Sequence, residues 1–233
     1  MRRRRRQINK ISGITLTIIF TIAFIALLPQ ELQIAILSIA IILPIIIIIY
    51  RLPSVKGFIG ELIVSRAIAK TSSEDKEQYI INNLILKDEN GKTSQIDHLI
   101  INQSGIYVIE TKNYKGTIYG DEQDFNWIQE LSNGKQYEFY SPVKQNLTHI
   151  NMVRKTIQMQ VPMYSIIVFI KGNIDNVNSN KVYRLKSFIE NIKHYEKIKI
   201  SVETVEEIYT ILKDYKDNPR ATIKEHINNI NKF

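Results

Sequence analysis

Two long runs without a charged side chain dominate the first fifty residues, at positions 11–28 and 34–50. As α-helices at about 1.5 Å per residue they would be roughly 25–27 Å long, close to the bilayer hydrocarbon core of about 30 Å. Pro29 and the polar residues after it interrupt a continuous helix. The sequence therefore predicts a transmembrane hairpin of two helices over residues 11–50, set in a lipid bilayer.

Positive charge flanks both ends of this predicted hairpin. Residues 1–53 hold seven Lys or Arg and one acid, whereas residues 54–233 hold 24 Lys or Arg and 22 acids. The positive-inside rule places the basic residues 1–10, the linker 51–56 and everything after it in the cytoplasm, giving a cell-membrane protein with both termini cytoplasmic. A cleaved signal peptide, a basic nucleic-acid arm and a helix pair confined to one leaflet stay open as alternatives.

The composition also excludes some classes of function. The net charge of +8 is concentrated in the basic head, so it does not by itself indicate nucleic-acid binding. The chain has no cysteine, which rules out disulfides and thiolate metal sites. No Gly-rich phosphate loop is present, so no nucleotide cofactor is expected. Two spans without internal charges offer no ion path, which disfavours a transporter.

The rest of the chain alternates between helical and strand-like patterns. Residues 57–70 have helical periodicity, and Phe58, Leu62, Ile63 and Ala67 can share one face. Ser141 and Pro142 are typical of a helix start, and we expect that helix to run to about Gln160. Strands are expected at 78–86, 117–119, 127–129 and 164–170, a hairpin at 95–112, and helices at 204–215 and 220–231. This order predicts an α/β fold, a mixed sheet flanked by helices.

The hairpin carries charges where core residues are expected. If it closes on a loop of residues 102–105, Ile101 faces Ile106, Leu99 faces Val108 and Asp97 faces Glu110. Directly opposed residues have Cβ atoms about 4.5–5.5 Å apart. Lys112 lies two residues beyond Glu110, hence on the same face. The apolar face of the hairpin therefore ends in two carboxylates and an ammonium.

Two opposed carboxylates on a half-buried face repel each other and destabilise the pair of strands. A divalent cation between them reverses this effect, because hard cations such as Mg²⁺ bind carboxylate oxygens. The alternative is an exposed hairpin end at which Lys112 neutralises one acid.

Asp97 followed by Glu110, Thr111 and Lys112 resembles the PD-(D/E)XK nuclease superfamily, although isoleucine rather than proline precedes the aspartate. More specifically, the chain resembles the nuclease-related domain (NERD) family. The matching motifs are GFIGE at 57–61, QIDH at 95–98, GIYVIETKN at 105–113, Gly116, Trp127 and PVKQ at 142–145. The resemblance implies a restriction-endonuclease-like core over residues 57–175, followed by a mostly helical extension at 176–233.

The resemblance also implies an activity and a site. The chain would be a nuclease that hydrolyses phosphodiester bonds of DNA with Mg²⁺, or Mn²⁺. Asp97, Glu110, the Thr111 carbonyl and Glu61 would surround the metal. Lys112 would orient or activate the attacking water, and Gln145 would help place water or phosphate. An inactive nuclease fold that serves as a binding or scaffold module at the membrane is the alternative.

Other polar and aromatic residues have simpler explanations. Glu61 could be a first-turn helix acid, and Gln145 an exposed helix residue. His98 should point away from Asp97, and His149 should lie behind the site or in solvent. Trp127 and Tyr114 could stack on bases, but core packing is the better interpretation.

Overall fold

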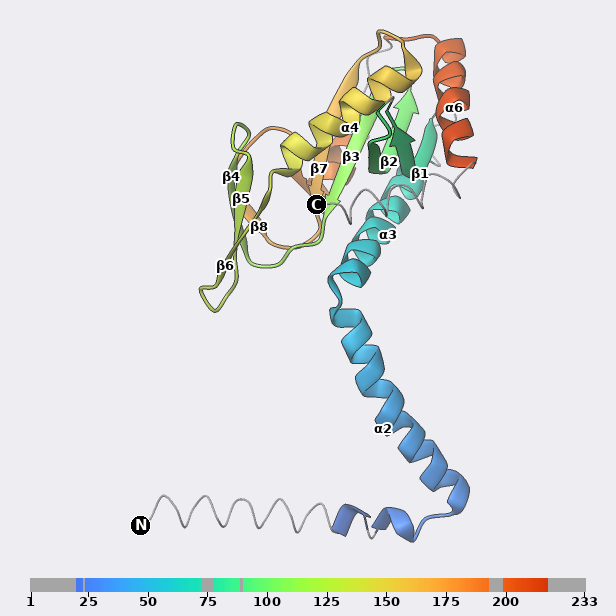
Figure 1. Ribbon diagram of the computed structural model, residues 1–233, viewed down its shortest axis with the longest axis vertical. Helices are drawn as coiled ribbons and strands as arrows, with labels where there is room; N and C mark the ends of the chain where they lie inside the picture. Colours follow the sequence, from blue (N-terminus) through green and yellow to red (C-terminus); the bar gives the residue numbers. More distant parts are fainter. Residues whose placement is uncertain (1–19, 23, 73–77, 89, 193–198, 218–233) are drawn as a thin grey trace. The chain divides into compact units, whose positions relative to one another are not determined.

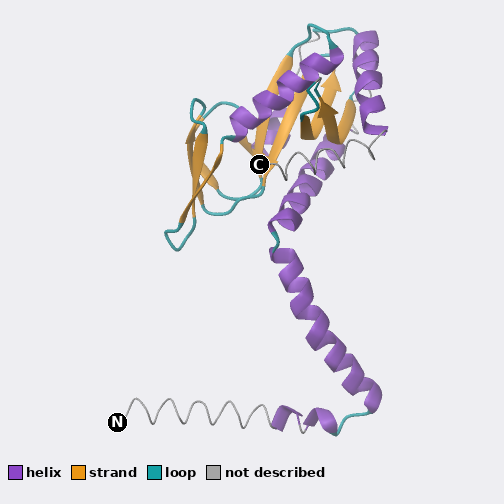
Figure 2. Cartoon of the chain, in the orientation of Figure 1, coloured by secondary structure: helices purple, strands orange, loops and turns teal. Residues whose placement is uncertain are grey.

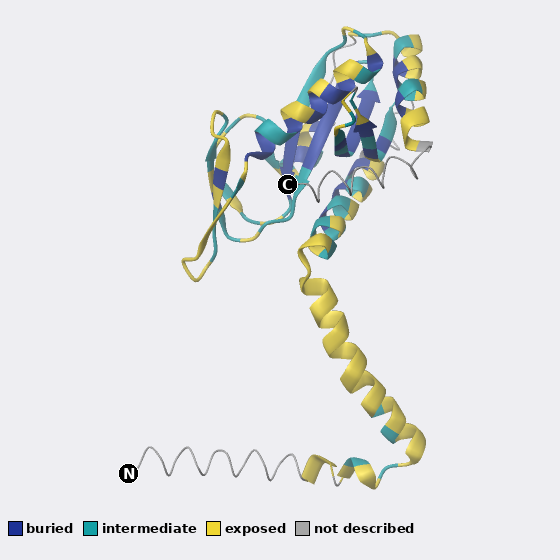
Figure 3. Cartoon of the chain, viewed as in Figure 1, coloured by how far each residue is buried: buried dark blue, intermediate teal, exposed yellow. Residues whose placement is uncertain are grey.

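The computed structural model describes residues 20–22, 24–72, 78–88, 90–192 and 199–217. The chain forms two compact units, Met1–Val55 and Lys56–Phe233. In the first unit, helix α2 (Gln30–Arg51) has 22 residues, a stretch of 18 residues with a mean hydropathy of 3.0, and no buried residue (Figure 3). Among the described residues it alone is long and apolar enough to cross a membrane. Most of the other predicted span, residues 11–28, lies outside them, so the two-span hairpin stays a prediction.

The chain turns just before α2, as Pro29 predicted. Pro29 is the N-cap residue of α2 and has an extended backbone, with φ −53° and ψ 144°. The Gln33 side-chain amide donates hydrogen bonds to the carbonyls of Leu28 at 2.8 Å and Ala26 at 3.3 Å. These two carbonyls lie before α2, where the preceding apolar run stops being helical, so no N–H of a following helical turn reaches them. Pro29 and Gln33 thus fix the break that separates the two apolar runs.

The predicted linker at residues 51–56 is wrong for most of its length. Helix α3 (Pro53–Ser72) begins almost where α2 ends, and only Leu52 lies between them. Leu52 is extended, with ψ 135°, because a following proline disfavours the helical conformation. Pro53 then occupies the first helical position, where its missing N–H is not needed. The helix therefore starts four residues earlier than the periodicity indicated.

The face that α3 buries also differs from the prediction. Gly60, Val64 and Ile68 are buried, whereas Phe58 is 63% exposed and Leu62 36% exposed. Both sets have the four-residue spacing of one helix face, so periodicity could not separate them. Gly60 decides between them, because a side chain there would lie 2.9 Å from Asn113 Cβ and 3.0 Å from Ile170 Cδ1.

Replacing Gly60 with alanine should therefore destabilise the domain by about 1–3 kcal/mol, the usual cost of overpacking. Gly57→Ala is the matched control, because nothing lies within 4 Å of its added Cβ. That change should be neutral or should stabilise α3 by up to about 1 kcal/mol, the helix propensity difference. Thermal unfolding of both variants measures this, and equal shifts would contradict the close approach at Gly60.

The main sheet of the second unit is mixed. Strands β1, β2 and β3 pair antiparallel, and β3, β7 and β9 run parallel to one another, in the order β1-β2-β3-β7-β9 (Figure 2). Their bounds are Tyr79–Lys87 for β1, Thr93–Asn102 for β2, Gly105–Lys112 for β3, Met163–Phe169 for β7 and Val182–Arg184 for β9. The predicted strands at 78–86 and 164–170 are confirmed to within one residue.

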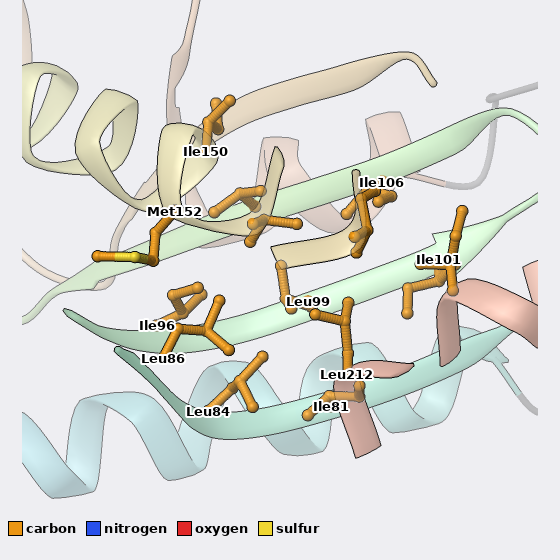
Figure 4. Close-up of a cluster of buried hydrophobic side chains, with 14 of the residues drawn as sticks. Ile81, Leu84, Leu86, Ile96, Leu99, Ile101, Ile106, Ile150, Met152 and Leu212 are labelled. Atoms are coloured by element: carbon orange, nitrogen blue, oxygen red, sulfur yellow. The ribbon is translucent and has the colours of Figure 1, made fainter. Parts of the chain in front are cut away.

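Helices cover both faces of this sheet, as the α/β prediction required (Figure 1). Helices α4 (Pro142–Ile157) and α6 (Val202–Asp217) pack on one face, whose core is shown in Figure 4. Helices α3 and α5 (Leu185–Ile192) pack on the other face. The first core contains Leu99, Val108, Ile150, Val153, Ile208 and Leu212, and the second contains Val64, Ile68, Ile100, Tyr107 and Phe188.

A second, smaller sheet was not predicted as such. It has the order β6-β5-β4-β8, and its strands are β4 (Thr117–Asp121), β5 (Asn126–Glu130), β6 (Gln136–Tyr140) and β8 (Asn173–Asn178). Trp127 is fully buried there, stacks on Phe169 and donates its indole N–H to the Asp121 carbonyl at 2.9 Å. Trp127 is therefore a core residue, as its simpler interpretation predicted.

The predicted helical extension at 176–233 is wrong in its first part. Position 175 falls inside β8, and the next strand, β9, joins the edge of the main sheet. Helix α6 starts at Val202, two residues before the predicted start at 204, and the Ser201 Oγ before it accepts the Thr204 N–H at 3.2 Å. The helix predicted at 220–231 lies outside the described residues. This C-terminal segment completes both sheets rather than following a finished domain.

Helix α4 starts as predicted. Ser141 is its N-cap residue and accepts the Lys144 N–H at 3.5 Å, and Pro142 follows at the first position. The helix ends at Ile157 instead of near Gln160, because Gln158 adopts a left-handed conformation with φ 53°. This start sets the helical phase of α4, and that phase turns Gln145 and His149 toward the sheet.

Candidate functional site

The hairpin of β2 and β3 has the predicted register. Leu99 pairs with Val108 and Ile101 with Ile106. The loop is shorter than predicted, because Asn102 also pairs with Gly105 and leaves only residues 103 and 104 in the turn. Gly105 has φ 132°, and a side chain there would collide with the Pro162 carbonyl. A glycine is required at this position.

Continued by one step beyond the pair His98 and Ile109, this register places Asp97 opposite Glu110. The Asp97 carboxylate accepts a hydrogen bond from the Thr111 N–H at 2.8 Å. The N–H and C=O of one strand residue point to the same side, so the Thr111 carbonyl also faces the β2 side. The Asp97 carboxylate and the Thr111 carbonyl oxygen therefore both lie on the β2 side of strand β3.

The strands are irregular at Asp97. Asn83 of β1 stands opposite it, between the pairs Asn82–His98 and Leu84–Ile96, and has φ 54°. Asparagine tolerates this left-handed conformation better than most residues. The alternation of side chains between the two faces of β2 also fails here. Ile96 and Leu99 are three residues apart and should face opposite sides, yet they belong to the same core cluster. Both strands are therefore locally irregular at Asp97, and no pattern in the sequence predicted this irregularity.

Glu110 is the centre of a buried polar network. Its side chain is 4% exposed, and its two carboxylate oxygens contact Lys112 Nζ at 2.7 Å and His149 Nε2 at 3.1 Å. Lys112 Nζ also donates to Gln145 Oε1 at 2.9 Å. Strand β3 and helix α4 thus supply a carboxylate, an ammonium, an amide and an imidazole in direct contact. The structure thus places Lys112 beside Glu110 and Gln145 beside Lys112, while their predicted roles in a site stay predictions.

His149 was expected behind the site or in solvent, yet it touches Glu110 directly. It is buried, and its Nδ1 lies 2.6 Å from the Ser94 hydroxyl of β2. Ser94 therefore holds the imidazole from behind, which fixes its orientation toward Glu110. The spacing of four residues from Gln145 could have indicated His149, because such residues share a helix face. Ser94 gave no signal in the sequence.

Asp97 and Glu61 are under electrostatic strain. Burial, followed by the nearby charges of Glu110 and Glu61, raises the pKa of Asp97 well above its usual value, against the opposing Thr111 N–H and Lys112. Burial and then Glu110 also raise the pKa of the Glu61 carboxyl on α3. The three acids are thus close enough to disfavour one another's charge.

Glu110 and Lys112 behave in the opposite way. Burial opposes both charges, but the Lys112 ammonium and the His149 contact hold the pKa of Glu110 below its usual value. The Glu110 carboxylate in turn raises the pKa of Lys112, although burial alone would lower it. Glu110 is therefore a carboxylate and Lys112 an ammonium at neutral pH.

The other predicted or considered residues are placed less directly. Glu61 interacts with Glu110 electrostatically, and within the described part of the chain no three Asp, Glu or His side chains converge as a ready metal cage. His98 bonds Asn82 at 2.8 Å, and burial lowers its pKa to about 4. It faces away from the site, as expected. Tyr114 packs edge-on against Phe139 in the core of the second sheet.

The donor set suits a hard divalent cation. Asp97, Glu110 and the Thr111 carbonyl offer only oxygen, which Mg²⁺ and Mn²⁺ prefer. Burial first, and then the neighbouring carboxylates, raise the pKa values of Asp97 and Glu61, so the charged forms of both acids are disfavoured without a cation. Asp97 and Glu110, with Glu61 nearby, would be the residues that hold such an ion.

A mixed sheet flanked by helices, with two acids and a lysine close together at one end of a hairpin, is consistent with a nuclease-like α/β domain. Residues 56–170 match the family described as the nuclease-related domain, NERD. The chain is also 33% identical over 182 residues to an uncharacterized protein of Bacillus anthracis, a match that covers 75% of this chain and 84% of the relative. The chain belongs to the NERD family. No solved structure matches it.

Proposed function

We propose that this protein is a membrane-anchored, cytoplasm-facing nuclease that hydrolyses phosphodiester bonds of DNA with Mg²⁺ or Mn²⁺. The observation that carries the proposal is the proximity of Asp97 on β2 to Glu110 on β3, which raises the pKa of Asp97 after burial, with the Lys112 ammonium 2.7 Å from Glu110. Membership of the nuclease-related family supports the reaction class. DNA as substrate follows from the family resemblance.

Each residue of the site has a different role in the proposed reaction. Lys112 stays protonated, so it places positive charge beside the phosphate and orients water rather than accepting a proton. Gln145 holds the Lys112 ammonium in place, and His149 holds the second oxygen of Glu110. Each functional side chain thus has a fixed partner, which is how an active site is pre-organised.

Asp97, Glu110 and the Thr111 carbonyl would hold the metal ion, with Glu61 adding negative charge nearby. When bound, a divalent cation lowers the pKa of its water and stabilises negative charge that develops on phosphate oxygens. The acids themselves keep this end of the hairpin negative, and Lys112 prevents that charge from repelling the phosphodiester.

Helix α2 supplies the proposed anchor. It has no charged residue between Glu31 in its first turn and Arg51 at its end, and none of its residues is buried, unlike the core helix of a soluble protein. Arg51 at its end precedes the domain, and the positive-inside rule then puts the domain in the cytoplasm. A second span over residues 11–28 completes the proposed hairpin.

The test uses the full chain in lipid nanodiscs with linear and circular DNA. We expect cleavage with Mg²⁺ or Mn²⁺, none with a chelator, and none from Glu110→Gln. Glu138→Gln, which changes an exposed carboxylate on β6, is the matched control and should retain full activity. Cleavage by a folded Glu110→Gln protein would contradict the site, and cleavage of circular DNA would identify an endonuclease.

One observation favours the alternative of an inactive binding or scaffold module. Residues 54–233 hold 24 Lys or Arg against 22 acids, whereas tight nucleic-acid binders usually show a basic stripe. That alternative predicts no turnover with any divalent metal. A wild-type chain that folds, keeps its DNA intact with Mg²⁺ and Mn²⁺, and is unaffected by Glu110→Gln would support the scaffold.

A further inference from the structure

Helix α3 has an apolar stripe that is exposed in the described part of its domain. The buried stripe of Gly60, Val64 and Ile68 packs against the main sheet. Phe58 and Leu62 lie two residues from this stripe, about 200° around the helix, and are 63% and 36% exposed. Arg66 continues the same line and is exposed. We call Phe58, Leu62 and Arg66 the outer stripe of α3.

Helix α3 carries more cations than acids. Its only acid, Glu61, is half-buried and interacts electrostatically with Glu110, while Lys56 and Arg66 are exposed. The outer stripe itself therefore combines two large apolar side chains with one cation, and Glu61 lies beside it, about 60° around the helix from Phe58. An interfacial helix has this composition, with apolar residues entering the headgroup region and cations meeting lipid phosphates.

Along the chain, the outer stripe begins seven residues after the end of the proposed membrane span. Only Leu52 separates the two helices. From Pro53, Phe58 is about 7 Å along the axis of α3, comparable to a headgroup layer of about 5–8 Å. Arg66 is about 20 Å along the same axis, so it meets lipid only if α3 lies along the surface.

We propose that the outer stripe of α3 lies on an anionic lipid surface, with Phe58 and Leu62 in the headgroup region and Arg66 on lipid phosphates. The proposal rests on the membrane anchoring by α2 but not on nuclease activity. It has a consequence for the site, because the same helix carries Glu61, about 60° around its axis from Phe58. The catalytic end of the hairpin would then be held at the membrane surface.

The absence of cysteine makes a direct test possible, since each single Cys substitution gives one labelled position. The full chain is placed in vesicles of phosphatidylcholine with phosphatidylglycerol, and Phe58→Cys, Leu62→Cys and Arg66→Cys are labelled with an environment-sensitive dye. We expect blue-shifted emission and quenching by nitroxide-labelled lipid at all three. Tyr137→Cys, half exposed on β6, is the matched control and should show neither.

The pattern of quenching decides between the possible results. Quenching at position 58 alone would mean that α3 stands away from the bilayer, and it would overturn the proposal. Labels at 62 and 66 that behave like the one at 137, in protein that sediments with the vesicles, would also overturn it. Protein that does not sediment would instead refute the anchor, whereas DNA cleavage has no influence on any of these readings.

A second comparison tests the charged half of the proposal. Arg66→Glu should weaken quenching at position 62 in vesicles that contain phosphatidylglycerol, because the new carboxylate is repelled by the anionic headgroups. In vesicles of phosphatidylcholine alone the same change should have a smaller effect. Equal quenching with and without Arg66→Glu in the anionic vesicles would contradict contact between Arg66 and lipid phosphate.

Discussion

Asp97→Asn should reduce DNA cleavage by about 10²–10³-fold or more, the cost of losing one group that stabilises a transition state. The amide keeps the size of the side chain and can still accept the Thr111 N–H, so the hairpin should keep its geometry. What disappears is a negative charge opposite Glu110. Cleavage assays in nanodiscs measure the effect. The control is Asp214→Asn, because Asp214 is an exposed acid on α6.

The same substitution should raise the stability of the metal-free protein. Burial and the charges of Glu110 and Glu61 raise the pKa of Asp97 in the folded state. Between its unfolded value of about 3.9 and the raised folded value, the native state binds the proton and the unfolded state does not, so stability falls as pH rises. Asp97→Asn removes this fall.

Thermal unfolding measured across this pH range without divalent metal tests the linkage. The wild type should lose stability as the pH rises above about 4, and the Asp97→Asn protein should lose less. Added Mg²⁺ should offset the loss in the wild type only. A variant that is less stable than the wild type at neutral pH would show that Asp97 is a structural residue, not a strained one.

Unlike Asp97→Asn, Lys112→Met should lower the stability of the protein, but like Asp97→Asn it should reduce DNA cleavage. It leaves the buried Glu110 carboxylate with His149 as its remaining charged or polar partner among the contacts described. Removing one member of a buried ion pair costs about 3–5 kcal/mol, because the other charge stays buried. Lys115→Met, exposed three residues further on, is the control and should change stability little.

A double variant separates the two roles of Lys112. Adding Glu110→Gln to Lys112→Met removes the unpaired charge, so part of the lost stability should return. Cleavage should stay absent, because both the carboxylate and the ammonium are gone. If the double variant is as unstable as the sum of the two single variants, the ion pair does not explain the loss.

The parts of the fold that could be predicted are those with local chemical signals. The register of β2 and β3 followed from a period of two and a short turn, and α4 from Ser141 and Pro142. Strands β6 and β8 could not be found in this way, since most of their side chains are exposed and give no alternation of buried and exposed positions. They exist because the smaller sheet packs Trp127 and Ile118 against β7, a tertiary effect.

The same distinction between local signals and tertiary contacts applies to the residues of the site. Glu110 and Lys112 share one strand, so their contact followed from strand geometry. The contact of His149 with Glu110 depends on how α4 packs across the sheet, and the Ser94 contact depends on the fold of β2 against the same helix. The exposed face of α3 was misassigned because the close approach at Gly60 involves Asn113 and Ile170, which are distant in sequence.

The position of β8 and β9 has a consequence for biosynthesis. Helix α2 is synthesised early, but the edges of both sheets wait for residues 173–184. At about 5–20 residues per second, roughly 7–27 s separate the emergence of Arg51 from that of Arg184. The ribosome would therefore deliver the apolar helix to the insertion machinery long before the attached domain can close, and any truncated version ending at residue 170 or 175 would stay an incomplete folding intermediate.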